Sequence, residues 1–206
     1  MASFKGEDFQ LCFLCVPDDE IAAVSEDIAV PNCLFCHVSG TKALAEIRAP
    51  QRAVAYFFQS ISAADEKLDF SKIDCFLEYE SDKHGKLLKQ IVRSLGNPTH
   101  ELKSEAREKL HLCGVLINNF GNQLLDIASV LLKKEGISME VLQSLYLKTF
   151  EKALQLGPKN SQTGPAKRKD AGTIDKHLKI LGQMDSHSEK LYRIFTERIQ
   201  EAPSKT

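Results

Sequence analysis

The sequence predicts an α/β half at about residues 1–100, followed by an all-helical half at about 101–206. Short apolar runs alternate with amphipathic segments in the first half, which is the pattern of a mostly parallel sheet with crossover helices. Prolines occur at positions 17, 31, 50 and 98, and then none occurs until 158. The stretch from Leu110 to Leu125 carries no charged side chain, which predicts a helix that protein surrounds.

The first half contains four predicted strands and three predicted helices. Continuous apolar runs indicate strands that are buried on both faces. A helix is expected where acidic residues or a hydroxyl cap precede an amphipathic run, as after Pro17 and at Thr41. The expected strands cover about 10–16, 33–38, 53–58 and 73–78, and the expected helices cover about 18–29, 41–47 and 82–95.

The second half begins with an unusually long predicted helix. It starts at Ser104 and ends near Glu135, before Gly136, so it would be about 46 Å long. Because its centre lacks a charged face, we expect a second subunit to cover it and the protein to be a homodimer. Further helices are predicted over about 138–156, 173–181 and 186–199, and a polar loop over 157–169.

Four of the six cysteines match the spacing of a zinc site. The pairs are Cys12-x2-Cys15 and Cys33-x2-Cys36, and such spacing fits a four-cysteine metal template. Both pairs, however, lie in predicted strands, where residues three apart point to opposite faces. We therefore expect reduced thiols and no metal.

The overall charge gives no indication of a strongly charged partner. With 27 basic and 28 acidic side chains the net charge is −1, which gives no reason to expect nucleic acid or an anionic membrane. Wholly apolar runs are too short to span a bilayer, and Glu7 and Asp8 lie where a signal peptide would be apolar. The expectation is a soluble, cytoplasmic protein that acts on a small-molecule substrate.

Polar residues gather at the end of one predicted strand, in His37-Val38-Ser39-Gly40. In open α/β sheets the carboxyl ends of the strands face the ligand crevice. A turn that ends the strand and caps a helix explains the same residues.

The uncharged centre of the long helix holds three polar side chains on one predicted face, His111, Asn118 and Asn122. They either form a satisfied core network or line a pocket for a substrate.

Two Gly-Pro turns bracket Lys159, Gln162 and Thr163 and precede a basic run. This segment is either a solvated loop or a site for an anionic group.

Taken together, several segments resemble one protein family. They are Val16-Pro17-Asp18-Asp19, His37-Val38-Ser39-Gly40, Asp69-Phe70-Ser71-Lys72-Ile73, Lys109-Leu110-His111 with Asn118 to Asn122, and Gly157-Pro158-Lys159 through Gln162-Thr163-Gly164-Pro165. In this order they resemble the Rossmann-like proteins with a domain of unknown function 2520, relatives of pyrroline-5-carboxylate reductase and the β-hydroxyacid dehydrogenases. The resemblance covers about residues 10–200.

The resemblance implies an NADP-dependent oxidoreductase that acts on a small carbonyl, imine or hydroxy compound. It implies a partial Rossmann-like sheet followed by a dimerising helical domain like the C-terminal domain of 6-phosphogluconate dehydrogenase. His111 would act as acid or base, and Asn118 and Asn122 would orient the substrate. The implied cofactor contacts are Val16, Pro17, Asp18, Ser39 and Gly40, and the implied substrate contacts are Lys159, Gln162, Thr163 and Gly164.

The sequence departs from that family in two respects. The chain begins at what resembles the fourth strand and contains no G-x-G-x-x-G, so the cofactor site is expected to be incomplete and Leu11–Val16 to be an edge strand. The start is either internal to a longer protein or that of a natural remnant. In β-hydroxyacid dehydrogenases a lysine lies four residues before an asparagine, but here Gly114 precedes Asn118 at that spacing. A non-catalytic dimerisation or ligand-binding module is therefore the alternative function.

Overall fold

A computed structural model describes residues 9–28, 30, 32–62 and 67–201. The chain divides into two compact units, Met1–Asn122 and Gln123–Thr206, whereas the sequence pattern placed a boundary near residue 100. The division falls later because a buried arginine at residue 107 ties the start of the long helix to the sheet. Residues 7 and 8, on which the expectation about a signal peptide rests, lie outside the described residues.

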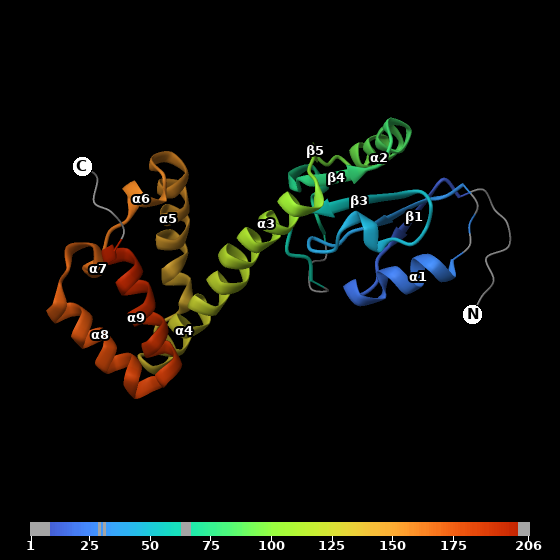
Figure 1. Cartoon of the computed structure of the whole chain (residues 1–206). Helices are drawn as coiled ribbons and strands as arrows, with labels where there is room; N and C mark the ends of the chain where they lie inside the picture. The colour runs from blue at the N-terminus through green and yellow to red at the C-terminus, as the bar shows by residue number, and fades with distance from the viewer. Residues whose placement is uncertain (1–8, 29, 31, 63–66, 202–206) are drawn as a thin grey trace. The chain divides into compact units, whose positions relative to one another are not determined.

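The first unit is built on a five-stranded sheet with the order β1-β2-β3-β4-β5 (Figure 1). The pairing is parallel except between β3 and β4, which confirms the mostly parallel sheet. The described part of the β3–β4 connection contains only a 3-10 turn, η3, and a parallel pairing would require a crossover helix there. Strand β5 was not predicted. The bounds are β1 Leu11–Leu14, β2 Leu34–His37, β3 Arg52–Phe57, η3 Phe70–Lys72, β4 Cys75–Tyr79 and β5 Thr99–Glu101.

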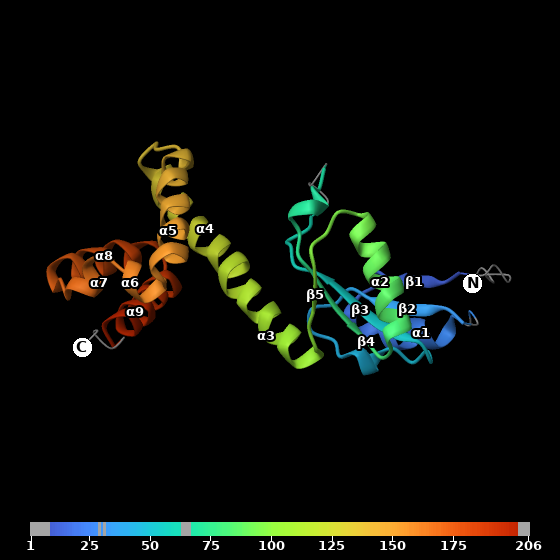
Figure 2. The same cartoon turned by 90° about the horizontal axis from the view of Figure 1, so that it is seen from above.

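Two helices cover opposite faces of this sheet (Figure 2). Cys36 of β2 belongs to a buried cluster with Leu88 of one helix, and its neighbour Phe35 belongs to another cluster with Ile21 of the other helix. Strand β2 is therefore buried on both faces, as its continuous apolar run predicts. The two helices are α1 Ile21–Asp27, preceded by the 3-10 turn η1 Asp18–Glu20, and α2 Asp82–Ser94.

The prediction of a short helix over 41–47 is wrong. Only a 3-10 turn, η2 (Leu44–Glu46), forms in this segment. The backbone N–H groups of Thr41 and Lys42 donate to the Ser39 hydroxyl, so the chain turns before a helix can begin. The Thr41 side chain is directed to Asp18 and caps no helix.

The long helix is confirmed as one run, Ser104–Lys134. It consists of α3 (Ser104–Gly114), a π-helical segment η4 (Val115–Asn119) and α4 (Phe120–Lys134). By length and composition alone, it could cross a membrane. This is weak evidence for a membrane span, because it rests on one helix and on length and composition only.

The second unit is helical, and its helices α8 and α9 pack against each other and against α7. The prediction of a polar loop over 157–169 is wrong in part, because two short helices form within this segment. Each begins with a proline that follows a glycine at positive φ, Gly157 at 79° and Gly164 at 99°, and proline suits the first helical position. The bounds are η5 Met139–Leu142, α5 Gln143–Leu156, α6 Pro158–Ser161, α7 Pro165–Arg168, α8 Ala171–Met184 and α9 Ser186–Glu201.

Candidate functional site

The carboxyl ends of β1 and β2 bring together the segments from which the candidate site is built. Leu14 pairs with His37 in the parallel register, so the residues that follow each strand leave the sheet side by side. The two predicted cofactor segments, Val16–Asp18 and Ser39–Gly40, are thereby neighbours. Ser39 Oγ donates to Asp18 Oδ2 at 2.8 Å, and Thr41 Oγ1 donates to the same oxygen at 2.9 Å.

His37 is a structural residue of this turn. Its side chain is fully buried, and its Nδ1 accepts the backbone N–H of Ser39 at 3.2 Å. The ring proton therefore lies on Nε2, which is 3.3 Å from the carbonyl oxygen of Ala43. Burial lowers the pKa of His37, so the imidazole is neutral and holds the turn closed.

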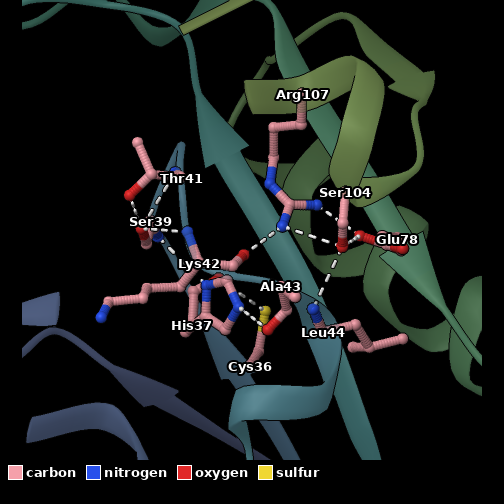
Figure 3. A network of polar contacts seen from close by, with 10 residues as sticks. All are labelled: Cys36, His37, Ser39, Thr41, Lys42, Ala43, Leu44, Glu78, Ser104 and Arg107. Carbon is pink, nitrogen blue, oxygen red and sulfur yellow. Dashed lines mark hydrogen bonds and ion pairs between the residues drawn. The ribbon is translucent and has the colours of Figure 1, made fainter. Parts of the chain in front are cut away.

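A buried ion pair anchors the same loop to α3 (Figure 3). The guanidinium of Arg107, which is fully buried, donates to the carboxylate of Glu78 on β4 and to the carbonyl oxygen of Lys42. Ser104 Oγ donates to the same carboxylate at 2.7 Å and accepts the backbone N–H of Leu44 at 3.1 Å. Loop, sheet and helix thus share one polar network, which positions the next turns of α3 over the loop.

One helical turn after Arg107, His111 lies against Gly40. Its Nδ1 is 3.1 Å from the hydroxyl oxygen of Tyr56 on β3. A Cβ atom on Gly40 would lie 2.6 Å from that Nδ1 and 2.9 Å from Cζ of Tyr56. Only glycine permits this approach, so His111 packs directly against the Ser39–Gly40 turn.

Asn118 and Asn122 do not form a buried core network within this chain. Both side chains are exposed, and Asn118 lies in the π-helical segment. A π turn is often found at functional sites. Their predicted role in orienting a substrate stays a prediction.

The other predicted substrate residues belong to the second unit, where three of them line two separate cavities. Lys159 and Gln162 line a cavity of about 560 Å³ together with Lys167 and Arg198. Thr163 lines a mainly apolar cavity of about 300 Å³. Gly164 caps α7.

The two thiols of the pair Cys33 and Cys36 do not lie together. Cys33 and Cys36 belong to the two clusters on opposite faces of the sheet, as strand alternation predicts. Burial raises the pKa of both thiols, and a thiol must be ionised to bind a metal. Cys15 is exposed, and the described residues contain no group of three or more metal-ligating side chains.

Sequence reasoning missed the residues that hold the site together. Arg107 and Glu78 were read only as helix and strand residues, and Tyr56 was not singled out. One signal was available, since Glu78 is the one charged residue of β4. Nothing in the sequence connects it with an arginine 29 positions later.

Comparison with known proteins decides the family. The family model described as Domain of unknown function (DUF2520) matches residues 73–199, which is more than half of the chain. The chain belongs to this family. No curated protein matches it.

The solved structures that are similar to the chain include proteins of three bacteria. A provisionally assigned NADP oxidoreductase of Bacteroides fragilis is 31% identical with a TM-score of 0.85, over 93% of this chain and 75% of that chain. A protein of Thermotoga maritima is 18% identical with a TM-score of 0.75, over 97% and 80% of the two chains. A provisionally assigned oxidoreductase of Mycobacterium avium is 14% identical with a TM-score of 0.55, over 91% and 76%. The last two show the fold alone, and the first supports an oxidoreductase-like family. A Rossmann-like α/β domain followed by a helical domain is therefore confirmed.

Proposed function

We propose that the chain provides the substrate-activating residues of an NADP-dependent oxidoreductase that acts on a small carbonyl, imine or hydroxy compound. The assignment of the Bacteroides fragilis relative supports the reaction class. The observation that carries the proposal is His111, whose imidazole lies beside Gly40 where two parallel strands end. This is the end of an open sheet at which ligands bind.

The residues at this end of the sheet fit only part of NADP. Asp18 and Ser39 offer an acceptor and a hydroxyl that suit a ribose or a nicotinamide amide. The first turn after β1 contains Asp18, Asp19 and Glu20, and three carboxylates repel a pyrophosphate. We therefore assign Val16–Asp18 and Ser39–Gly40 to the ribose and nicotinamide side, and no residue of this turn to the phosphates.

In the proposed reaction each polar residue has a separate task. NADPH, when bound, supplies the hydride. His111 interacts with the oxygen or nitrogen of the reacting double bond, where negative charge develops. Asn118 and Asn122 hydrogen-bond the remaining polar groups of the substrate. For Lys159, Gln162, Thr163 and Gly164 of the second unit, contact with a substrate stays a prediction from the family resemblance.

Replacing His111 by alanine is expected to lower substrate-dependent NADPH oxidation about a hundredfold, because general acid–base groups contribute at least that much. The assay uses the full chain, millimolar NADPH and a panel of small aldehydes, ketones, cyclic imines and hydroxy acids. His187→Ala is the matched control, since this histidine is exposed on α9. Equal rates for His111→Ala and the unsubstituted protein would contradict the proposal.

The alternative function, a dimerisation or ligand-binding module, has an observation of its own. In the described part of the second unit only Ala166, Leu178 and Leu181 are buried apolar residues. Helix α5 exposes large apolar side chains along its length, namely Leu145, Tyr146, Leu147, Phe150 and Leu154. So large an exposed apolar surface indicates a protein partner, and we propose a second copy of this chain.

Light scattering at micromolar concentration is expected to give twice the 23.0 kDa mass of the chain. Phe150→Glu should shift the protein to the monomer, because a buried unpaired carboxylate is costly. Ile61→Glu, at an exposed apolar position of the first unit, should leave the dimer intact. A monomer mass for the unsubstituted chain would count against the homodimer. Cytoplasmic location and the lack of nucleic-acid and membrane partners remain expectations from composition.

A further inference from the structure

Tyr56 and His111 form a hydrogen-bonded pair that no sequence motif predicts. The two residues lie on β3 and α3, 55 positions apart, with 3.1 Å between the tyrosine hydroxyl and Nδ1. Their ring centroids are 6.0 Å apart and the rings are tilted by 58°, so the hydrogen bond and not ring stacking determines the contact. Both side chains are half-buried.

The chemistry of the two groups decides which one donates. A phenol O–H is a stronger donor than a neutral imidazole N–H, and an unprotonated imidazole nitrogen is a stronger acceptor than a phenol oxygen. Burial raises the pKa of Tyr56, so its hydroxyl keeps its proton at neutral pH. The tyrosine therefore donates to Nδ1, and the proton of the neutral imidazole lies on Nε2.

Gly40 closes the Nδ1 side of the ring. Its Cα lies so near that an added Cβ would be 2.6 Å from Nδ1, which leaves no room there for a substrate atom. On the other side, Nε2 of His111 has no partner among the described residues, and it is not one of their fully buried unpaired atoms. The Nε2–H group is therefore free to donate to a ligand.

We propose that Tyr56 fixes His111 in the Nε2–H tautomer and so makes His111 a hydrogen-bond donor, not a base, toward the substrate. Tyr56 is a positioning residue, because it acts through His111. This inference rests on the proposed function only for the identity of the acceptor, a carbonyl oxygen or imine nitrogen. The tautomer belongs to the free protein and can be measured without a substrate. A donor at this place polarises a double bond for reduction.

Nitrogen-15 NMR of the histidine side chains tests the tautomer in the full chain at about pH 8, where ordinary imidazoles are neutral. The His111 signals, assigned with His111→Gln, should show a protonated Nε2 and an unprotonated Nδ1. In Tyr56→Phe the two shifts should move toward the values of a free imidazole, which exchanges between tautomers. A protonated Nδ1 in the unsubstituted protein, or unchanged shifts in Tyr56→Phe, would overturn the proposal.

The second unit provides a matched control. His177 Nδ1 is 2.8 Å from the hydroxyl of Tyr192, so Tyr192→Phe should change the signals of His177 and leave those of His111 unchanged. Gly40→Ala keeps both residues of the first pair but crowds Nδ1, and it should alter the His111 signals as strongly as Tyr56→Phe does. If Tyr56→Phe fails to fold, Gly40→Ala decides in its place: unchanged His111 shifts in that variant would contradict the geometry.

Activity separates this inference from the proposed function. With an active substrate, Tyr56→Phe should lower kcat about tenfold, the worth of one hydrogen bond, and leave KM within about twofold. If no tested compound is reduced, the proposed function fails while the tautomer measured by NMR still stands. If His111 is essential but carries its proton on Nδ1, the proposed function survives and the role of Tyr56 is wrong.

Discussion

Replacing Arg107 by methionine is expected to lower the free energy of unfolding of the first unit by about 3–5 kcal/mol. The guanidinium is fully buried and holds the carboxylate of Glu78 and the carbonyl of Lys42. Without it, Glu78, whose side chain is only 14% exposed, becomes an unpaired charge in a poorly solvated site. Such a loss exceeds the effect of most surface substitutions by severalfold.

The loss in the free energy of unfolding of the first unit is measured by urea unfolding, monitored through hydrogen exchange of peptides from β2 to β4. Arg107→Met combined with Glu78→Leu should recover part of the stability, because Nε of Arg107 has no partner even in the native network and an apolar pair leaves no charge unpaired. The control is Arg193→Met, which removes an exposed pair with Glu189 and should cost at most about 1 kcal/mol. Equal losses for Arg107→Met and Arg193→Met would show that the buried pair is not an anchor.

The 206-residue chain is expected to bind NADPH and NADH only in the millimolar range, about a thousandfold more weakly than a complete dinucleotide site. Most affinity in such sites comes from the pyrophosphate, which a glycine-rich turn and a helix N-terminus hold. The sequence contains no such turn, and the turn after β1 presents carboxylates. Each missing charge-assisted hydrogen bond is worth about 1.5–3 kcal/mol, and about 1.4 kcal/mol is a factor of ten.

Calorimetric titration with both cofactors provides the measurement. Asp18→Asn is an informative companion variant, since it removes one carboxylate and keeps an acceptor for Ser39. It should not weaken binding of the anionic cofactor. A dissociation constant of about 10 μM or tighter, about −7 kcal/mol, would show that residues other than those at the ends of β1 and β2 hold the phosphates.

Several features of the molecule follow from local pattern alone. The alternation of apolar runs and helices predicted the mostly parallel sheet, and uninterrupted apolar residues predicted that β2 is buried on both faces. The two-residue period of a strand separated the thiols of Cys33 and Cys36. The long helix from Ser104 was predicted within one residue of its end at Lys134. Each of these features depends on neighbouring residues, so the sequence expresses it directly.

The tertiary structure alone decided which distant polar groups meet. Arg107 looks in sequence like one more charge on a solvated helix face, and only the crossing of α3 over β4 buries it beside Glu78. Tyr56 meets His111 because β3 and α3 place both side chains against Gly40. The turn at Ser39 likewise displaced the predicted helix, since a side-chain hydroxyl competed for the backbone N–H groups that a helix would use. A pairing between elements depends on register and helix placement, which residues nearby in sequence do not encode.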